Sequence, residues 1–324
     1  MADLLELMIC RMPGLKGEER IELLKKFDNE GDFSLLSKRD IESFLGRNLG
    51  GRAWIMPEIR ALAEKDAAAA VKWGIRRVSW RDITYPPLLR EIFDPPVLLF
   101  YRGALPNPEK PLVAVVGTRK PSPAATARAF TLGKELGEAG IPVVSGLALG
   151  IDAMAHRGNI EGGSPTVAVL GSGPDQLYPS SKRALARRIL ETGGVILSEY
   201  PPGTGQKKWN FPVRNRIISA LARGTVIVEA PEKSGALITA RYALEQGRDL
   251  WVDTGGVSSP KGRGTARLAE EGAGIISSAH DILAEWNIAG HAESGRSERN
   301  GMSHNDVSPS GLASSLAEYL NIKL

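Results

Sequence analysis

The sequence predicts an α/β protein with a Rossmann-like, doubly wound and mainly parallel sheet, preceded by a small N-terminal helical domain. Between residues 108 and 286 the chain alternates between β-branched runs and helical stretches, the pattern of strands joined by crossover helices. The strand runs are apolar without polar alternation, as expected of strands that helices cover on both faces. Before residue 74, strand-like runs are absent and apolar residues recur at three-to-four spacing.

Residues 1–73 are predicted to form the helical domain, in which segments such as IELLKKF and AEKDAAAAVKWG have helical periodicity. Within it, MPGLKGEERIELLKKF places a turn with Gly14 and Gly17 ahead of a helix, an arrangement that some helix-hairpin-helix DNA binders use. An ordinary helix start explains the same residues. We favour that interpretation, because short motifs carry a high risk of false positives.

Residues 74–107 are predicted to be an extended connector to the Rossmann-like domain. The segment contains the pairs Pro86-Pro87 and Pro95-Pro96 and one short apolar strand, VLLFYRG. At the other end of the chain, residues 287–324 are rich in Gly, Ser, Asn and His and offer too little apolar surface to pack. We expect a disordered linker there, followed by a short tail helix.

Six strands are predicted in the Rossmann-like domain, at residues 112–116, 142–145, 166–170, 194–198, 225–229 and 249–253. The helical segments between them include TARAFTLGKELGEAG, SKRALARRILETG, RNRIISALARG and SGALITARYALEQG. Each of these segments ends at a glycine. We expect these glycines to close the helices in the left-handed conformation.

Composition excludes several classes of protein. Apolar residues make up 42% of the 324 residues, and no run approaches the roughly 18 apolar residues that span a bilayer. The N-terminus lacks the features of a signal peptide, so we expect a cytoplasmic protein without a membrane segment. Cys10 is the only cysteine and the four histidines have no metal-ligand spacing, so we expect neither a disulfide nor a metal.

The charge balance favours a polyanionic partner. Formal net charge is +4 and the sequence pI is about 9.1.

In open α/β sheets ligands bind beyond the carboxyl ends of the strands, so the residues that follow each strand are candidates for the site. After the first strand come Gly117, Arg119 and Lys120, which supply a close backbone approach and positive charge beside a helix N-terminus.

The same loop argues against a dinucleotide cofactor, because only one glycine of the dinucleotide fingerprint is present. We therefore expect no cofactor.

After the second strand, Gly146 and Gly150 shape a loop whose N–H groups can face an anion. Asp152 and His156 follow at a spacing of four on one helix. They permit an acid-base pair, but we favour structural roles for both because no nucleophile accompanies them.

The segment after the fourth strand is the most informative. Lys207, Lys208, Arg214 and Arg216 are interleaved with Trp209 and Phe211, which combines phosphate neutralisation with flat surfaces for base stacking. This combination is typical of single-strand binding. The alternative is that Phe211 packs under its own helix and that the charges are only solvated.

The remaining loops contribute hydroxyl groups, glycines and cations. Ser234 is predicted to cap the helix after the fifth strand, and Gly235 to admit a phosphate near the positive end of that helix. The loop after the sixth strand holds Lys261, with Arg263 and Arg267 behind it. For the loop after the third strand, from Gly171 to Arg183, we expect a structural and dimer-related role. Several loops thus carry glycine, hydroxyl and cationic groups at one edge of the sheet, and a chain of phosphates explains this number of candidate phosphate sites better than a single nucleotide does.

Seven segments between residues 113 and 273 resemble the DNA-processing protein A (DprA, or Smf) family: VAVVGTRK, VVSGLALGIDAMAHRG, TVAVLGSG, LSEYPPG, FPVRNRIISALA, VEAPEKSGALITARYALEQG and SPKGRGTARLAEEGA. The stretch from Gly74 to Gly103, which contains DITYPPLLREIFDPPVLLFYRG, is similar to the family's lead-in to its Rossmann domain. The N-terminal helices resemble its sterile-alpha-motif-like domain. The resemblance thus extends over most of the chain.

The resemblance implies a bacterial cytoplasmic protein, not an enzyme, that binds and protects single-stranded DNA. It further implies a homodimer that loads RecA recombinase during natural transformation. The family's DNA pocket carries over onto three groups of residues and one more loosely aligned lysine. These are Gly117, Thr118 and Arg119; Ser145 and Gly146; Phe211, Arg214, Asn215 and Arg216; and Lys208.

The chain also departs from the family's pattern. Thr118 stands in place of the usual serine and keeps its hydroxyl, and Ser172 replaces a cysteine, which argues against thiol chemistry. Asp253-Thr254-Gly255 replaces a P-G-S sequence and Ala266 replaces an asparagine, so DNA contact by the sixth loop is in doubt. Residues 287–324 are too few for the C-terminal winged helix that many members carry.

One alternative belongs to a different class of function. Related Rossmann folds include phosphoribohydrolases, nucleotide-processing enzymes with the motif P-G-G-x-G-T-x-x-E. The corresponding turn here reads EKSGALITARYALE, without paired glycines or that glutamate. We therefore favour a DNA-binding protein over an enzyme.

Overall fold

The computed structural model of the chain describes residues 4–51, 54–177 and 182–288. The predicted linker and tail helix at 287–324 lie almost wholly outside these residues. Within the described part, no helix is long and apolar enough to cross a membrane. That part also holds no cluster of three or more His, Cys, Asp or Glu side chains suited to a metal ion.

Among residues 4–51 and 54–75, five helices precede the first strand, as the helical periodicity predicts. They are α1 (Leu4–Arg11), α2 (Gly17–Lys26), α3 (Glu30–Ser34), α4 (Lys38–Leu45) and α5 (Met56–Lys72). Ser37 caps α4 in a capping box with Asp40, and Gly46 closes it in the left-handed conformation, with φ of 66°. Gly14 and Gly17 lie in the turn before α2 and at its first residue, which is an ordinary helix start.

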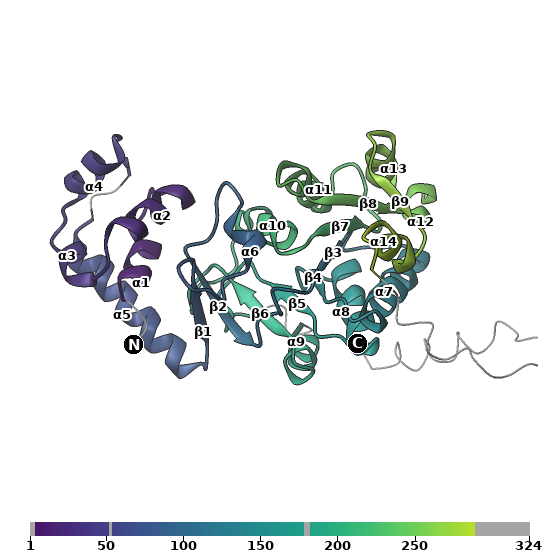
Figure 1. Cartoon of the computed structure of the whole chain (residues 1–324), viewed down its shortest axis with the longest axis horizontal. Coiled ribbons are helices and arrows are strands. Elements are labelled where there is room, and N and C mark those ends of the chain that lie inside the picture. Colours follow the sequence, from purple (N-terminus) through teal and green to yellow (C-terminus); the bar gives the residue numbers. More distant parts are fainter. Residues whose placement is uncertain (1–3, 52–53, 178–181, 289–324) are drawn as a thin grey trace, which may run out of the picture. The chain divides into compact units, whose positions relative to one another are not determined.

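One nine-stranded sheet forms the centre of the fold, in the order β1-β2-β6-β5-β4-β3-β7-β8-β9. Figure 1 shows the strands in this order from left to right. The first two are β1 (Arg76–Ser79) and β2 (Leu98–Gly103), joined through the short helix α6 (Pro87–Arg90). Strand β1 pairs with β2, and β2 pairs with β6, both in antiparallel orientation. All the other pairings are parallel, as expected for a doubly wound sheet.

From β3 onward strands and helices alternate. The strands are β3 (Val113–Val116), β4 (Val143–Ser145), β5 (Val167–Val169), β6 (Val195–Ser198), β7 (Gly224–Ile227), β8 (Asp249–Asp253) and β9 (Gly274–Ile276). The helices are α7 (Pro123–Glu138), α8 (Ile151–Glu161), α9 (Lys182–Glu191), α10 (Asn210–Leu221), α11 (Gly235–Glu245), α12 (Thr254–Ser258), α13 (Arg263–Glu270) and α14 (Ala279–Glu285). All six predicted strands are present.

Helices cover both faces of the sheet, which is why its strands are apolar throughout. In β3, Val113 and Val115 pack with α7, α8 and α14, whereas Ala114 and Val116 pack with α10 and α11 on the other face. This alternation follows from the two-residue period of a strand. The core therefore lies in two layers, one on each face.

The segment predicted as a connector, residues 74–107, contributes two strands to the sheet edge. In β2, Leu98 and Phe100 pack against α1, α2 and α5, while Leu99 packs into the core of the sheet. A strand that is buried on both faces reads as a continuous apolar run, and VLLFYRG is such a run. Residues 1–288 accordingly form one compact unit.

One of the predicted helix-closing glycines has a different role. Gly140, Gly193 and Gly247 adopt positive φ after α7, α9 and α11. Gly224 does not, and it begins β7 instead. A Cβ at Gly224 would lie 2.1 Å from the ring of Trp251. The absence of a side chain there makes room for that indole, so the prediction of a left-handed cap at Gly224 is wrong.

Candidate nucleic-acid interface

A cavity of about 870 Å³ lies at the carboxyl ends of β3 and β7. From β3 the chain winds through β4 and β5 to β6 on one side, then returns to place β7 on the other side of β3. The helices that follow the two strands, α7 and α11, cover opposite faces of the sheet. This reversal is the topological switch point at which open α/β sheets bind ligands.

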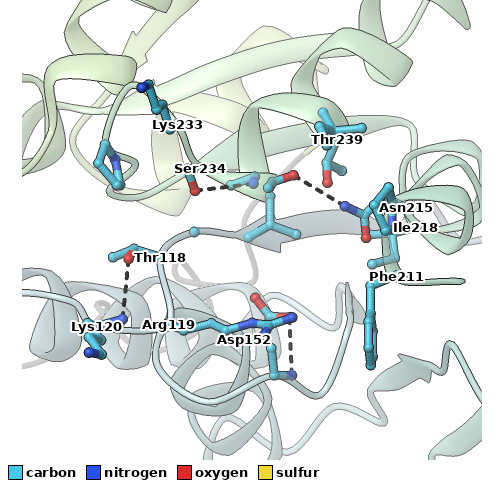
Figure 2. A pocket seen from close by; sticks show the side chains of 18 of the residues that line it. Thr118, Arg119, Lys120, Asp152, Phe211, Asn215, Ile218, Lys233, Ser234 and Thr239 are labelled. Carbon is cyan, nitrogen blue, oxygen red and sulfur yellow. Dashed lines mark hydrogen bonds between the residues drawn. The ribbon is translucent and has the colours of Figure 1, made fainter. Parts of the chain in front are cut away.

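The loop after β3 forms one wall of the cavity (Figure 2). Its backbone is fixed on two sides, because the Thr118 N–H donates to the Glu229 carbonyl at 2.8 Å and the Thr118 carbonyl accepts from Ile151 at 3.3 Å. Gly150 makes this packing possible. Its φ is +84°, and a Cβ there would lie 2.4 Å from the Thr118 carbonyl oxygen. Arg119, at the tip of this loop, is exposed.

The Glu229 carboxylate holds two loops of the site. Its Oε1 accepts from the Ser122 hydroxyl at 2.8 Å and from the Ser259 hydroxyl at 2.5 Å, and its Oε2 accepts from the Ser122 N–H at 2.8 Å. Burial acts to raise the pKa of Glu229, but these hydrogen bonds bring that pKa below its ordinary value. Glu229 is therefore a charged anchor beneath the loops that carry Arg119 and Lys261.

The opposite wall is the N-terminal turn of α11. The Ser234 hydroxyl caps this helix by accepting from the Ala236 N–H at 3.2 Å. A Cβ built at Gly235 would meet nothing within 4 Å, so the backbone is open to a ligand there. Figure 2 shows Lys233 and Ser234 across the cavity from Thr118 and Arg119. A capped helix start beside a lysine favours an anion.

Two buried ionisable side chains, Asp152 and Arg214, also line the cavity. Asp152 accepts from the N–H groups of Gly146 at 3.1 Å and Ala148 at 3.3 Å. Burial raises the pKa of Asp152, and the charge of Arg214 opposes this effect. The Arg214 guanidinium donates to the carbonyls of Gly146, at 3.0 Å, and Val169. Burial lowers the pKa of Arg214 to about 10, so it is protonated at neutral pH.

An aromatic ring stands at one side of the cavity. Phe211, in the first turn of α10, is half-buried. The Arg119 guanidinium lies over its ring, with 5.5 Å between the guanidinium carbon and the ring centroid. Asn215, one turn further along α10, donates to the Gly235 carbonyl at 3.3 Å and links this helix to α11.

The lining is strongly positive. Its exposed cations come from the loops after β3, β6, β7 and β8, and none of them forms a salt bridge with a carboxylate of the described residues: Arg119, Lys120, Lys208, Lys233 and Lys261. Asp152 is the only carboxylate in the lining, and it is buried beside Arg214. An unneutralised positive cavity with one aromatic wall suits a polyanion that carries flat groups.

Nine of the twelve residues predicted for the site line this cavity: Gly117, Thr118, Arg119, Lys208, Phe211, Arg214, Asn215, Ser234 and Gly235. Ser145 and Gly146 lie behind it. Ser145 is buried and its hydroxyl donates to the Val115 carbonyl at 2.7 Å. A Cβ at Gly146 would lie 2.5 Å from the Arg214 guanidinium, so this glycine makes room for a lining residue.

Arg216 lies outside the cavity, contrary to what the resemblance implies. It is buried on another face of α10 and pairs with Glu199 and Asp94. Residues of an α-helix are about 100° apart, so positions 214 and 216 differ by about 200° around the axis. Two arginines at that spacing do not reach the same cavity, and Arg214 is the one that faces it.

Other lining residues are absent from the sequence-based site. Lys233 and Lys261 are the clearest, and each directly precedes the N-cap residue of a helix, α11 and α13 respectively. That signal was available in the sequence for both. Lys261 also shows that the loop after β8 reaches the cavity despite its departures from the family's pattern. Ile238 and Thr239 lie within α11, where the sequence carries no mark of a ligand.

Asp152 and His156 do not contact each other as an acid-base pair. Their partners differ, because Asp152 binds backbone N–H groups whereas the His156 Nδ1 contacts the Thr166 hydroxyl at 2.7 Å. Both side chains are buried. Their contacts are those of structural residues.

Comparison with known proteins identifies the family. The sequence model of the family described as DNA recombination-mediator protein A matches residues 76–287. The chain belongs to this family. The match covers β1 to α14, and hence every residue that lines the cavity.

Two members of the family illustrate the likeness in sequence. The DNA processing protein DprA of Bacillus subtilis is 40% identical over 219 residues, which are 67% of this chain and 73% of the relative. The protein Smf of Borreliella burgdorferi is 33% identical over 282 residues, 87% of this chain and 88% of the relative. The second match extends into the N-terminal helices.

Two solved structures of family members share the fold. The X-ray structure of DNA processing protein A from Streptococcus pneumoniae matches with a TM-score of 0.71 and 34% identity, covering 87% of this chain and 97% of that one. A structure of the Helicobacter pylori protein, which concerns its single-stranded DNA binding mode, matches with a TM-score of 0.59 and 29% identity. It covers 67% of this chain and 97% of that one.

Proposed function

We propose that this protein binds single-stranded DNA through the cavity between β3 and β7 and acts as a mediator of DNA recombination. The observation that carries the proposal is the lining of that cavity. Five exposed cations without carboxylate partners among the described residues line it together with one aromatic ring, Phe211, over which Arg119 lies. Cations neutralise phosphates and an aromatic face accepts an unstacked base, so this combination favours a single strand over a duplex.

Family membership gives independent support. The chain belongs to the DNA recombination-mediator protein A family, and the Helicobacter pylori relative is described as a single-stranded DNA binder. We further propose that the protein works in the cytoplasm, protects incoming single strands and loads RecA recombinase on them in natural transformation. The proposed role is binding, without a catalytic step.

We also propose that the protein acts as a homodimer. Strand β9 is the last strand of the sheet, and in the described residues it pairs only with β8. Ile275 in this strand is 58% exposed. An open strand edge with an exposed apolar side chain is a ready site for pairing with another chain. Light scattering of wild type and Ile275→Lys tests the dimer, which the lysine should weaken.

The binding test is a fluorescence-anisotropy titration with labelled 30-mer single strands and matched duplexes at two salt concentrations. We expect tight binding that strongly prefers the single strand and weakens with salt, by about 0.7 in log affinity per log salt for each phosphate neutralised. Weak binding of both substrates at low salt would contradict the proposal.

RecA loading needs a separate test, because binding alone does not establish it. RecA ATPase activity is measured on single strands already covered by a single-strand-binding protein, with and without this protein. We expect the protein to shorten the lag before RecA activity. An unchanged lag, together with tight DNA binding, would leave the binding proposal standing and remove the loading role.

A further inference from the structure

The cavity between β3 and β7 changes in character along α11. At the start of this helix Lys233 and Ser234 line it, and one turn further Thr239 does. Figure 2 shows Lys233 and Ser234 toward one end of the cavity, and Asn215, Ile218 and Thr239 toward the other. We call the second end, which these three residues of α10 and α11 line, the α10–α11 seam. All five exposed cations of the lining lie in loops outside the seam.

Thr239 carries a hydroxyl that has no partner among the described residues. Its side chain is only 1% exposed and lines the cavity, yet its Oγ1 forms no hydrogen bond with the part of the chain that the structure describes. Figure 2 shows this oxygen turned toward the interior of the cavity. Other helical hydroxyls bind the carbonyl one turn back, as in Thr126 and Ser219. An unpaired buried hydroxyl destabilises a fold, so its place in a cavity wall points to a ligand.

The seam suits an uncharged hydrogen-bonding group. Ile218 is buried and makes one side of the seam apolar. Asn215 is held in a fixed orientation, because its Nδ2 donates to the Gly235 carbonyl at 3.3 Å and its Oδ1 accepts from the Arg214 Nε at 3.2 Å. The Arg214 guanidinium is also bound by backbone carbonyls. A phosphate at the seam would therefore lose hydration beside Ile218 with little in return, whereas a hydroxyl needs only one hydrogen bond.

The spacing of the two ends matches the parts of one nucleotide. Gly235 and Thr239 are four residues apart on α11, which is about 6 Å along the helix axis. The open backbone at Gly235, beside Lys233, suits a phosphate. The sugar hydroxyls of a nucleotide lie at a similar distance from its 5′-phosphate. A sugar hydroxyl is thus the uncharged group that reaches Thr239 when the phosphate lies at Gly235.

We propose that the α10–α11 seam is a ribose subsite. In this arrangement the Thr239 hydroxyl binds the 2′-hydroxyl of a ribonucleotide whose 5′-phosphate lies at the start of α11. The 2′-hydroxyl both donates and accepts, and it is the group by which proteins distinguish RNA from DNA. A deoxyribonucleotide occupies the same place but leaves Thr239 unpaired. The inference rests on the proposed binding of single strands in this cavity and adds a sugar preference to it.

The test compares 12-nucleotide oligouridylate with its 2′-deoxy form, which has the same bases and phosphates, in a fluorescence-anisotropy titration. Wild type should bind the ribose strand roughly three- to tenfold more tightly, as expected for one added hydrogen bond. Thr239→Val replaces the hydroxyl with a methyl group of similar size. This variant should bind both strands with the affinity that wild type has for the deoxy strand. The comparison within each protein removes effects of the free strands' own conformations.

Free nucleotides distinguish the two sources of such a ribose. The cavity volume of about 870 Å³ falls within the ~300–1,000 Å³ range of small-ligand sites. Uridine 5′-monophosphate and its 2′-deoxy analogue are therefore titrated as competitors of the labelled deoxy strand. If the ribose form competes at lower concentration with wild type but not with Thr239→Val, a free ribonucleotide is a sufficient ligand. If only the strands show the ribose preference, the ligand is RNA.

Thr225 supplies the matched control. Its hydroxyl is also buried without a partner in the described chain, but it lies in β7 and does not line the cavity. Thr225→Val and Thr239→Val should both be at least as stable as wild type in urea, because each removes an unpaired buried hydroxyl. Only Thr239→Val should lose the ribose preference. The same loss in Thr225→Val would overturn the subsite, because the effect would not depend on the cavity wall.

The outcomes distinguish the two proposals. If wild type binds neither strand, the proposed single-strand binding is wrong. If wild type binds both strands equally, or if Thr239→Val keeps the ribose preference, the subsite is wrong while single-strand binding stands. A marked loss of stability in Thr239→Val would also overturn the subsite, because the hydroxyl would then serve the fold and not a ligand.

Discussion

The Arg216 guanidinium forms a two-pronged ion pair with the Glu199 carboxylate, with Nη1–Oε1 at 2.9 Å and Nη2–Oε2 at 2.7 Å. Its Nε also donates to the Asp94 carboxylate at 3.0 Å, and Asp94 accepts from the Gly17 N–H at the start of α2. Burial acts to lower the pKa of Arg216, but the two carboxylates raise it above its ordinary value. Helix α10 is thus tied to α2 on the face turned away from the cavity.

Replacing Arg216 should destabilise the protein without removing a phosphate contact. Arg216→Met leaves Glu199 without its partner, and breaking one side of such a buried pair costs about 3–5 kcal/mol. We expect the free energy of unfolding in urea to fall by that amount. The slope of log affinity against log salt should stay as in wild type. A stable variant with a slope flatter by about 0.7 would return Arg216 to the DNA site.

Replacing Arg119 should weaken the salt dependence of DNA binding and leave the stability of the protein unchanged. Arg119 is exposed, so Arg119→Ala should leave the unfolding free energy within about 0.5 kcal/mol of wild type. The slope for oligothymidylate should flatten by about 0.7, because one phosphate loses its cation. Arg39→Ala is the matched control, since Arg39 is exposed on α4 and outside the cavity. Equal slopes for the two variants would exclude Arg119 from the phosphate contacts.

Glu229 offers a test in which electrostatics and positioning predict opposite results. Glu229→Gln removes a negative charge near the cavity, which by charge alone would strengthen binding of an anion. It also replaces one of the two acceptor oxygens with an NH₂ group, so at least one of the donors from Ser122 and Ser259 loses its acceptor. Leaving such a buried donor unpaired costs about 1–3 kcal/mol. We expect lower stability and weaker DNA binding in the same titration. Stronger binding would show that Glu229 does not position the loops.

His156 should make stability depend on pH. The Thr166 hydroxyl donates to the Val143 carbonyl at 2.8 Å, so the His156 Nδ1–H donates to Thr166. The His156 Nε2 is buried and has no partner in the described part of the chain. Burial, with a smaller effect of the Arg214 charge, lowers the pKa of His156 to about 3.

The direction of this pH dependence is set by the difference in proton binding between the folded and the unfolded chain. Between pH 6.5 and 3 the unfolded chain protonates His156 and the folded chain does not, so stability is full above pH 6.5 and falls with pH below it. The slope is up to about 1.4 kcal/mol per pH unit for one group. Urea unfolding at several pH values should show that the free energy of unfolding depends less steeply on pH for His156→Asn than for wild type. Parallel curves would mean that His156 does not titrate differently in the two states.

The sequence predicted the parallel part of the sheet closely. The first predicted strand, residues 112–116, corresponds to β3 at Val113–Val116, and the last, 249–253, to β8 at Asp249–Asp253. These strands are buried on both faces, and that burial requires the β-branched runs by which they were found. Strand β9 was missed, because a three-residue strand that begins with Gly274 carries no such run.

The sequence by itself also predicted where the candidate site lies. Parallel strands end at one edge of the sheet, so the loops after them had to meet there, and nine predicted residues do. Only the tertiary structure decided which side chains of α10 face the cavity. Helical periodicity separates Arg214 from Arg216, but the choice between them depends on which face packs against the core beside β3.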